Sequence, residues 1–380
     1  MLAEAMDAPL PDLFSFSGQL EVIKQKVTSK FQVKDLFYDR GVLTFEVEPG
    51  DHKIKFKQLT EELKSLNSLP TLGLEDGRLL LRILEFRRRP SKRTRVPLIL
   101  LLATVGTISV DGALRILLDS HYLELISPVT LPKLILYVSI YTAILLGVFG
   151  LHELGHKIAS ARKGMDSSLP YFIPGVPGWL PTMGAVIFQR EPATNRDELF
   201  DLGLSGPLVG FLVTVVATVF TFAIAPVPTP AQWQNWMASG AEFQAFPVPL
   251  LFDIVIFAVV PNSQGIYVTP LILACWLGSM VTSLNLMPVW QLDGSKTFSA
   301  VFPRRVQKIA SYAALAVLFL TGWFFFAFIL LFLMPRAPDV PPLDRYSPLT
   351  RSRKLAFVGA LFMLGLTYVV NFQVYAAFLP

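Results

Sequence analysis

The sequence predicts a polytopic α-helical membrane protein, with about six to seven transmembrane segments and a small amino-terminal cytosolic α/β domain. Three observations support this fold class. The composition is 53% hydrophobic and only 16% charged, whereas soluble domains are about 25% charged. Long apolar runs recur along the chain, and lysine and arginine are concentrated between some of these runs but absent between others. We therefore expect lipid to surround much of the chain.

Six apolar runs are candidates for crossing a bilayer, which takes about 20 residues. They are residues 97–110, 134–151, 204–225, 270–288, 306–334 and 355–378. A further segment, residues 247–261, is too short to cross and is expected to lie in the outer interface or to re-enter partway. The fifth run contains Thr321 and Gly322. We expect it to break there into a hairpin, because one continuous helix would place the arginines that follow on the outer side.

The positive charges predict the orientation. Residues 87–95 contain six lysines and arginines immediately before the first run. Because cytoplasmic loops are enriched in these residues, the amino terminus is expected in the cytosol. The stretch 197–295 contains neither lysine nor arginine, so the loop within it is expected on the opposite side. The first residues lack the basic start and apolar stretch of a signal peptide. We therefore expect a multi-pass protein of a prokaryotic cell membrane.

Residues 18–86 have the pattern of a small α/β domain. Helical periodicity covers residues 18–31 and 56–66, while alternation typical of strands covers residues 42–48 and 78–86. The order, a helix followed by two strands and then repeated, predicts a two-layer sandwich. Neither a phosphate-binding loop nor a nucleic-acid motif is present. The basic cluster beside an apolar span is expected to contact lipid headgroups, and no nucleic-acid partner is expected.

A metal-binding pattern lies at the end of the second apolar run. His152, Glu153 and His156 form the sequence HELGH, which has the HExxH spacing. Histidines four residues apart project from one face of a helix and can bind the same zinc ion. The intervening glutamate then stands beside the water that zinc activates and can accept its proton. This pattern predicts amide hydrolysis, with Glu153 as the base.

Two histidines leave a catalytic zinc site incomplete, because such sites usually have three protein ligands and one position for water. The single cysteine, Cys275, lies inside an apolar run, so a histidine or carboxylate is needed. His52 lies in the predicted soluble domain and His121 on the predicted outer side. Carboxylates near inner helix ends are Asp293, Asp197, Glu198 and Asp201. Asp293 fits the requirement, and spacing alone leaves the other three as rivals.

Two separated motifs resemble those of the site-2 protease family of intramembrane metalloproteases. The first is HELGH in an apolar helix, and the second is NLMPVWQLDG at residues 285–294, which matches the pattern NxxPxxxLDG. The resemblance implies one zinc ion per chain held by His152, His156 and Asp293, with Glu153 as the catalytic base. It also implies a substrate-holding or oxyanion role for Asn285.

The resemblance covers about residues 134–294 and extends loosely to residues 341–354. The segment 168–188 is similar to the one that precedes the central helix in plastid and many prokaryotic members, without a PDZ insertion. Ser205, Gly206 and Pro207 resemble the start of that helix. Around Gly184 and Val186 we expect an edge strand that pairs with an unwound substrate, because a helical substrate hides its carbonyls.

The sequence therefore predicts an intramembrane zinc metalloprotease that cuts transmembrane protein substrates near the cytoplasmic side. We expect residues 1–95 to form the cytosolic domain and basic linker, residues 96–304 the protease core, and residues 305–380 further membrane segments. The alternatives are a zinc-binding membrane transporter, an inactive member that binds membrane partners, and a soluble metalloprotease tethered by spans. Glu153 between the two histidines favours catalysis over transport.

Overall fold

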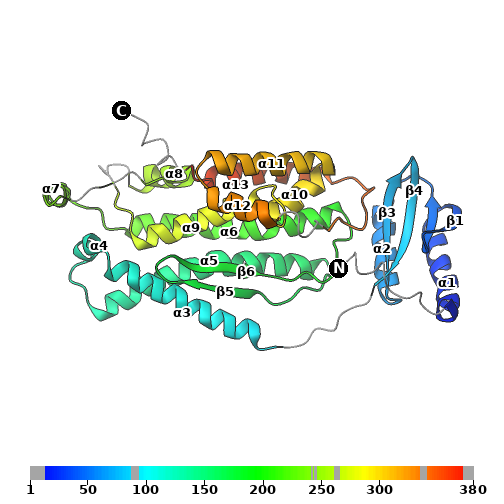
Figure 1. The fold of residues 1–380 in the computed structure, drawn as a ribbon, viewed down its shortest axis with the longest axis horizontal. Helices are drawn as coiled ribbons and strands as arrows, with labels where there is room; N and C mark the ends of the chain where they lie inside the picture. Colours follow the sequence, from blue (N-terminus) through cyan, green and yellow to red (C-terminus); the bar gives the residue numbers. More distant parts are fainter. Residues whose placement is uncertain are drawn as a thin grey trace. The chain divides into compact units, whose positions relative to one another are not determined.

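The computed structural model describes residues 13–86, 94–240, 243, 246–260, 266–333 and 340–370 (Figure 1). The chain forms two compact units. The first contains residues 1–91, 192–196 and 341–349, and the second contains residues 92–191, 197–340 and 350–380. Most of the basic cluster at residues 87–95 and the end of the last apolar run, residues 371–378, lie outside the described residues.

The first unit is a two-layer α/β structure, as the order of its segments predicts. Its elements are α1 (Leu13–Thr28), β1 (Val33–Asp39), β2 (Val42–Val47), α2 (Lys53–Lys64), β3 (Ser68–Glu75) and β4 (Arg78–Glu85). The four strands form an antiparallel sheet in the order β1-β2-β4-β3. Gly41 and Gly77 have φ angles of 81° and 79° in the two hairpin turns, where left-handed backbone favours glycine.

The core of this unit lies between its helices and the sheet. Buried residues of α1, such as Ile23, and of α2, such as Leu59, join alternate residues of the strands, such as Phe45 and Leu81. This alternation is what a sheet with one buried face requires.

Two distant segments complete the first unit. The N–H of Leu72 in β3 donates to the carbonyl oxygen of Leu343 at 2.9 Å, and the N–H of Arg345 donates to the carbonyl oxygen of Leu72 at 2.9 Å. In turn, the N–H of Leu343 donates to the carbonyl oxygen of Ala193 at 3.0 Å. Leu343 is also part of the core. The chain therefore returns to this unit twice, immediately before α6 (Arg196–Ile224) and before α13 (Arg351–Thr367).

The second unit is helical, with one β-hairpin. Besides α6 and α13 it contains α3 (Val96–Leu117), α4 (Ser120–Leu125), α5 (Leu131–Arg162), β5 (Tyr171–Val176), β6 (Leu180–Val186), α7 (Pro230–Ala238), α8 (Leu250–Val259), α9 (Pro270–Leu286), α10 (Asp293–Val301), α11 (Arg304–Leu320) and α12 (Phe324–Leu333). Within the described part of the chain, α3, α5 and α6 are long and apolar enough to cross a membrane. All three belong to this unit, and the shorter apolar helices α8 and α9 accompany them.

The predicted break in the fifth apolar run is present. Helix α11 ends at Leu320, Gly322 has a φ of 86°, and α12 begins at Phe324. The two helices pack against each other and share a core with Met287 and Val289, which follow α9. The short segment expected at residues 247–261 contains α8, whose buried residues Leu251, Phe252 and Val255 pack into the main core of the unit.

The start predicted for the central helix at Gly206 and Pro207 is wrong. Helix α6 begins ten residues earlier, at Arg196, and Pro207 lies inside it. Asp197 and Glu198 in its first turn are favourable at a helix amino terminus. A membrane helix tolerates an internal proline because neighbouring helices and polar groups satisfy the freed carbonyl.

The hairpin of β5 and β6 lies along the membrane helices. In Figure 1 the two strands run between α3 and α5, and residue contacts join β5 to α3 and β6 to both helices. The strands pair antiparallel, with Tyr171 opposite Val186 and Val176 opposite Leu180. The hairpin thereby places an extended segment beside the helix that contains HELGH.

Candidate metal centre

Helix α5 presents both motif histidines on one side. His152 and His156 are one turn apart, and their Nε2 atoms are 3.2 Å from each other. The side chain of His152 is 4% exposed and that of His156 is 12% exposed. Both side chains direct the same ring nitrogen at one point, which is typical of two histidine ligands of a common metal ion.

Asp293 is the third member of this group. It is the first residue of α10, and its Oδ2 atom lies 3.1 Å from Nε2 of His152 and 2.9 Å from Nε2 of His156. A tight connection from α9 brings it there. Gly294 packs so closely against this connection that a Cβ atom would lie 2.2 Å from the carbonyl oxygen of Met287, and Gln291 has a φ of 60°. The LDG motif therefore needs its glycine for packing.

The three donor atoms fit a zinc ion. Tetrahedral zinc with bonds of about 2.0–2.1 Å separates its ligand atoms by roughly 3.3 Å, and the three separations here are 2.9, 3.1 and 3.2 Å. Two imidazole nitrogens and one carboxylate oxygen form a donor set that suits zinc. Three protein ligands also leave the fourth tetrahedral position for water or substrate. Among the residues that the structure describes, His152, His156 and Asp293 form the group that could bind a metal ion.

Surrounding groups orient two of these ligands. Nδ1 of His156 donates to the carbonyl oxygen of Leu202 at 2.8 Å, so Nε2 is the ring nitrogen that remains to bind metal. Nζ of Lys296 donates to Oδ1 of Asp293 at 3.0 Å and so directs Oδ2 toward the histidines. The lysine lies on the same helical face, three residues after the aspartate. The three-residue spacing between Asp293 and Lys296 can be read from the sequence and indicates their pairing. The backbone carbonyl of Leu202 is not distinguished by its residue type, so its contact with His156 could not be read from the sequence.

Glycines of α6 make room for the centre. A Cβ atom on Gly210 would lie 3.1 Å from Nδ1 of His152, and one on Gly203 would lie 2.7 Å from the carbonyl oxygen of Asp293. On α5, a Cβ atom on Gly155 would lie 2.6 Å from the carbonyl oxygen of Ser205. Small residues therefore let α5, α6 and α10 approach closely, as they do between membrane helices in general.

Glu153 is half-buried and follows His152 on α5. Its carboxyl group lies close enough to Asp293 and Lys296 for their charges to act on it. Glu153 therefore lies beside the metal-binding group but does not belong to it.

Asn285, Gly184 and Val186 lie on two different elements. Asn285 is half-buried in the last turn of α9, and none of the hydrogen bonds found among the described residues joins it to the metal group. Gly184 of β6 has a φ of 92°, and a Cβ atom there would lie 3.7 Å from the ring of Phe149, one turn before His152. Val186 ends the same strand and is 41% exposed. The hairpin thus passes beside α5 just before the motif.

The rival carboxylates belong to a different cluster. Asp201 receives hydrogen bonds from Nε and Nη2 of Arg353, both at 2.7 Å, and also pairs with Lys163 at 2.7 Å. Asp197 pairs with Arg353 at 3.0 Å. Neither these two aspartates nor Glu198 belongs to the metal-binding group. Asp197 and Asp201 join α6 to α13, and Asp201 also joins α6 to Lys163, which follows α5.

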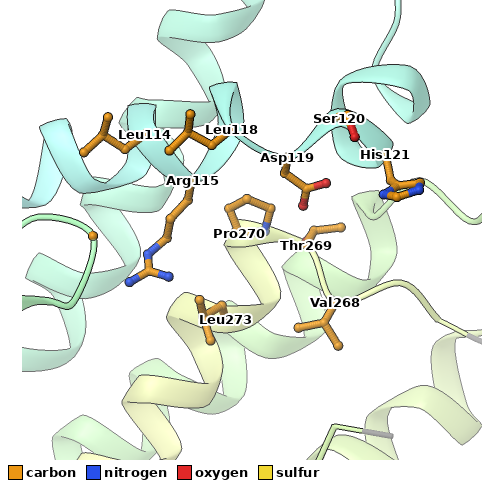
Figure 2. Close-up of a pocket in the computed structure, with 11 residues that line it drawn as sticks. Leu114, Arg115, Leu118, Asp119, Ser120, His121, Val268, Thr269, Pro270 and Leu273 are labelled. Atoms are coloured by element: carbon orange, nitrogen blue, oxygen red, sulfur yellow. The ribbon is translucent and has the colours of Figure 1, made fainter. Parts of the chain in front are cut away.

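The remaining histidines have other surroundings. His52 bonds through Nε2 to the carbonyl oxygen of Glu48 at 2.6 Å in the first unit. His121 packs against Trp236 and Phe243 and lines a pocket of about 510 Å³ at the end of α3 (Figure 2). That pocket contains no member of the metal group.

Known proteins resemble this chain over the same region. The chain is 25% identical over 256 residues to the chloroplastic "Probable zinc metalloprotease EGY2" of Oryza sativa subsp. indica, covering 66% of this chain and 45% of that protein. It is 27% identical over 231 residues to the chloroplastic "Probable zinc metalloprotease EGY1" of Arabidopsis thaliana, covering 58% and 41%. The chain thus spans less than half the length of these relatives.

No solved structure gave a significant match. Residues 140–330, half of the chain, match Peptidase family M50. This region contains HELGH, the hairpin, α6, α9 and Asp293, which confirms the resemblance to the site-2 proteases. The chain belongs to peptidase family M50.

Proposed function

We propose that the protein is an intramembrane zinc metalloprotease that hydrolyses peptide bonds within or near the transmembrane segments of other membrane proteins. One observation carries this proposal: His152 and His156 of the apolar helix α5 meet Asp293 of α10 in one metal-binding group. Glu153 lies on α5 directly after His152. Ionisable groups inside membrane helices are costly and usually functional. Family membership supports the same reaction class.

His152, His156 and Asp293 would hold the metal, and Glu153 would act as the general base. When bound, zinc supplies Lewis-acid polarisation of the scissile carbonyl and a lower pKa for water. Glu153 accepts the proton of the attacking water and later donates it to the departing amine. Leu202 and Lys296 hold the ligands in orientation through the bonds described above.

The hairpin is proposed to bind the substrate as an added strand. A transmembrane substrate must unwind before its carbonyls can be attacked, and an unwound segment needs new partners for its backbone groups. Gly184 and Val186 lie on β6, and β6 passes beside Phe149, one turn before His152. Pairing along β6 would therefore bring an extended substrate toward the metal centre. Asn285 is proposed to hold the substrate or support the developing oxyanion.

We place the amino terminus in the cytosol of a prokaryotic cell, in a multi-pass topology. The basic cluster at residues 87–95 precedes α3, and α5 ends in Arg162, after the HELGH motif. The enrichment of basic residues on the cytoplasmic side supports this orientation. The proposed protease core is residues 96–304, and cleavage is proposed near the inner leaflet, releasing a cytosolic fragment.

Purified protein in liposomes tests this function. With zinc present, the proposal predicts cleavage of a reporter transmembrane substrate near its cytoplasmic end, as found by mass spectrometry of the products. A zinc-sensitive dye inside the same liposomes reports transport. Zinc movement without cleavage across a panel of substrates would contradict the proposal and support a transporter, whereas cleavage in the outer leaflet would contradict the proposed orientation.

A further inference from the structure

A carboxylate buried within helix α3 binds the tip of the hairpin. Asp111 is 0% exposed. Its Oδ1 atom accepts a hydrogen bond from the N–H of Gly178 at 2.6 Å, in the turn between β5 and β6. Its Oδ2 atom accepts from Oη of Tyr141 on α5 at 2.5 Å and from Nε of Arg115 at 2.7 Å. One side chain therefore joins α3, α5 and the hairpin.

This arrangement is costly to build in a membrane helix. A buried carboxylate is tolerated only when it is paired and its oxygens are hydrogen bonded. Arg115 supplies the opposite charge and also donates to the carbonyl oxygen of Trp179 at 3.3 Å, so both charged residues contact the hairpin turn. Gly178 has a φ of 85°, which suits the tight turn that presents its N–H to Asp111.

The hairpin has further contacts with both helices. Thr107 of α3 donates from Oγ1 to the carbonyl oxygen of Pro181 at 3.0 Å. At its other end the hairpin lies against α5, where the ring of Phe172 is 3.5 Å from the Cβ position of Gly150. Tyr141 precedes His152 by eleven positions, about 16 Å along a helix. The hairpin therefore extends from the Asp111 anchor toward the metal centre.

The anchor is separate from the metal group. Arg115 and Gly178 line the pocket of Figure 2 together with Pro270, the first residue of α9. Asp293, by contrast, follows the opposite end of α9. A change at the anchor can therefore move the hairpin without removing any zinc ligand.

We propose that Asp111 is a positioning residue for proteolysis. It holds the hairpin at one fixed register beside α5, so that a substrate strand paired with β6 presents a single peptide bond to the metal centre. It acts through Gly178 and Tyr141 and does not touch the substrate. The inference rests on the proposed protease function, and it adds the residue that determines which bond is cut.

The test compares Asp111→Asn with Ser109→Ala. An asparagine retains one acceptor oxygen but directs an N–H group at donors and lacks the charge that pairs with Arg115. Ser109 joins the same helices through a 3.1 Å hydrogen bond to Thr142, and none of its described hydrogen bonds reaches the hairpin. Thr107→Val, which removes the bond to Pro181, provides a milder second variant.

Three readouts are measured in detergent: hydrogen exchange of peptides covering residues 171–186, zinc content, and the termini of the cleavage products. For Asp111→Asn we expect about tenfold faster exchange in the hairpin, full zinc content, kcat/KM lower by about 10- to 100-fold and cuts at several neighbouring bonds. Thr107→Val should change in the same direction but less, and Ser109→Ala should match the unaltered chain.

Unchanged hairpin exchange in Asp111→Asn would overturn the inference, as would faster exchange with unchanged cleavage at the same bond. Equal acceleration throughout α3 and α5 would also overturn it, since that result indicates general loosening of the helices. These outcomes differ from failure of the proposed function, in which the unaltered chain itself cleaves no substrate.

Discussion

A Cβ atom on Gly206 would lie 2.1 Å from Nε2 of His156. This is far inside any contact distance that two such atoms can adopt, so helix α6 can lie against the metal centre only while position 206 has no side chain. The relationship explains why a glycine occupies the middle of a membrane helix, where it otherwise weakens the helix relative to alanine by about 1 kcal/mol.

Gly206→Ala is therefore expected to displace His156 and to lower zinc affinity by at least about tenfold, with loss of cleavage. Zinc content after dialysis against a chelator series measures the effect. Gly359→Ala is the matched control, because that glycine lies in helix α13 of the same unit but has open space where its Cβ would be. Equal zinc affinity in the two variants would show that α6 is not in close contact with His156.

Asp293 and Asp201 are expected to respond differently to the same substitution. Asp293→Asn weakens a ligand and should reduce zinc content with little change in thermal stability of the metal-free protein. Asp201→Asn should leave zinc content unchanged but destabilise the fold by about 1–2 kcal/mol, because Arg353 and Lys163 lose a charged partner. Thermal unfolding in detergent and metal analysis separate the two effects, and a loss of zinc in Asp201→Asn would contradict the ligand assignment.

Val186→Pro tests pairing of the substrate with β6. Proline removes a backbone N–H from the strand, so cleavage should slow by about tenfold or more while zinc is retained. Val186→Thr keeps both the N–H and a β-branched side chain, and its cleavage rate should remain near that of the unaltered chain. If the proline variant cleaves as fast as the threonine variant, the substrate does not pair with this strand.

Leu343 is expected to stabilise the first unit although it lies far along the chain from that unit's sheet. It is 7% exposed and packs in the core of the first unit, so Leu343→Ala should destabilise this unit by about 2–4 kcal/mol. Hydrogen exchange of peptides within residues 42–85 measures the change. Val340→Ala serves as control because that side chain is 59% exposed; similar exchange in the two variants would refute the role of Leu343.

Local patterns predicted much of this architecture. Alternation at residues 42–48 and 78–86 matches β2 and β4, because one face of the sheet is buried. Thr321 and Gly322 marked the break between α11 and α12, where the chain adopts a positive φ. The HExxH spacing placed two histidine side chains on one helical face, and their nitrogens indeed meet.

Features that depend on tertiary packing were not predictable in the same way. Spacing along the chain does not relate Asp293 to His152, and the resemblance to a family suggested their pairing. Pro207 looked like a helix start, yet neighbouring helices allow it inside α6. Nothing local indicates that Leu343 joins the first unit or that Asp111 receives the N–H of Gly178.

The most direct test of the account is to measure zinc content and cleavage of a reporter transmembrane substrate for Glu153→Gln and the unaltered chain in parallel. Glutamine has nearly the same shape but cannot accept the proton of water. We predict full zinc content in both proteins and a loss of cleavage of about 100-fold or more in the variant. Cleavage by Glu153→Gln at the rate of the unaltered chain, with zinc bound, would contradict the proposed role of Glu153 and with it the proposed protease mechanism.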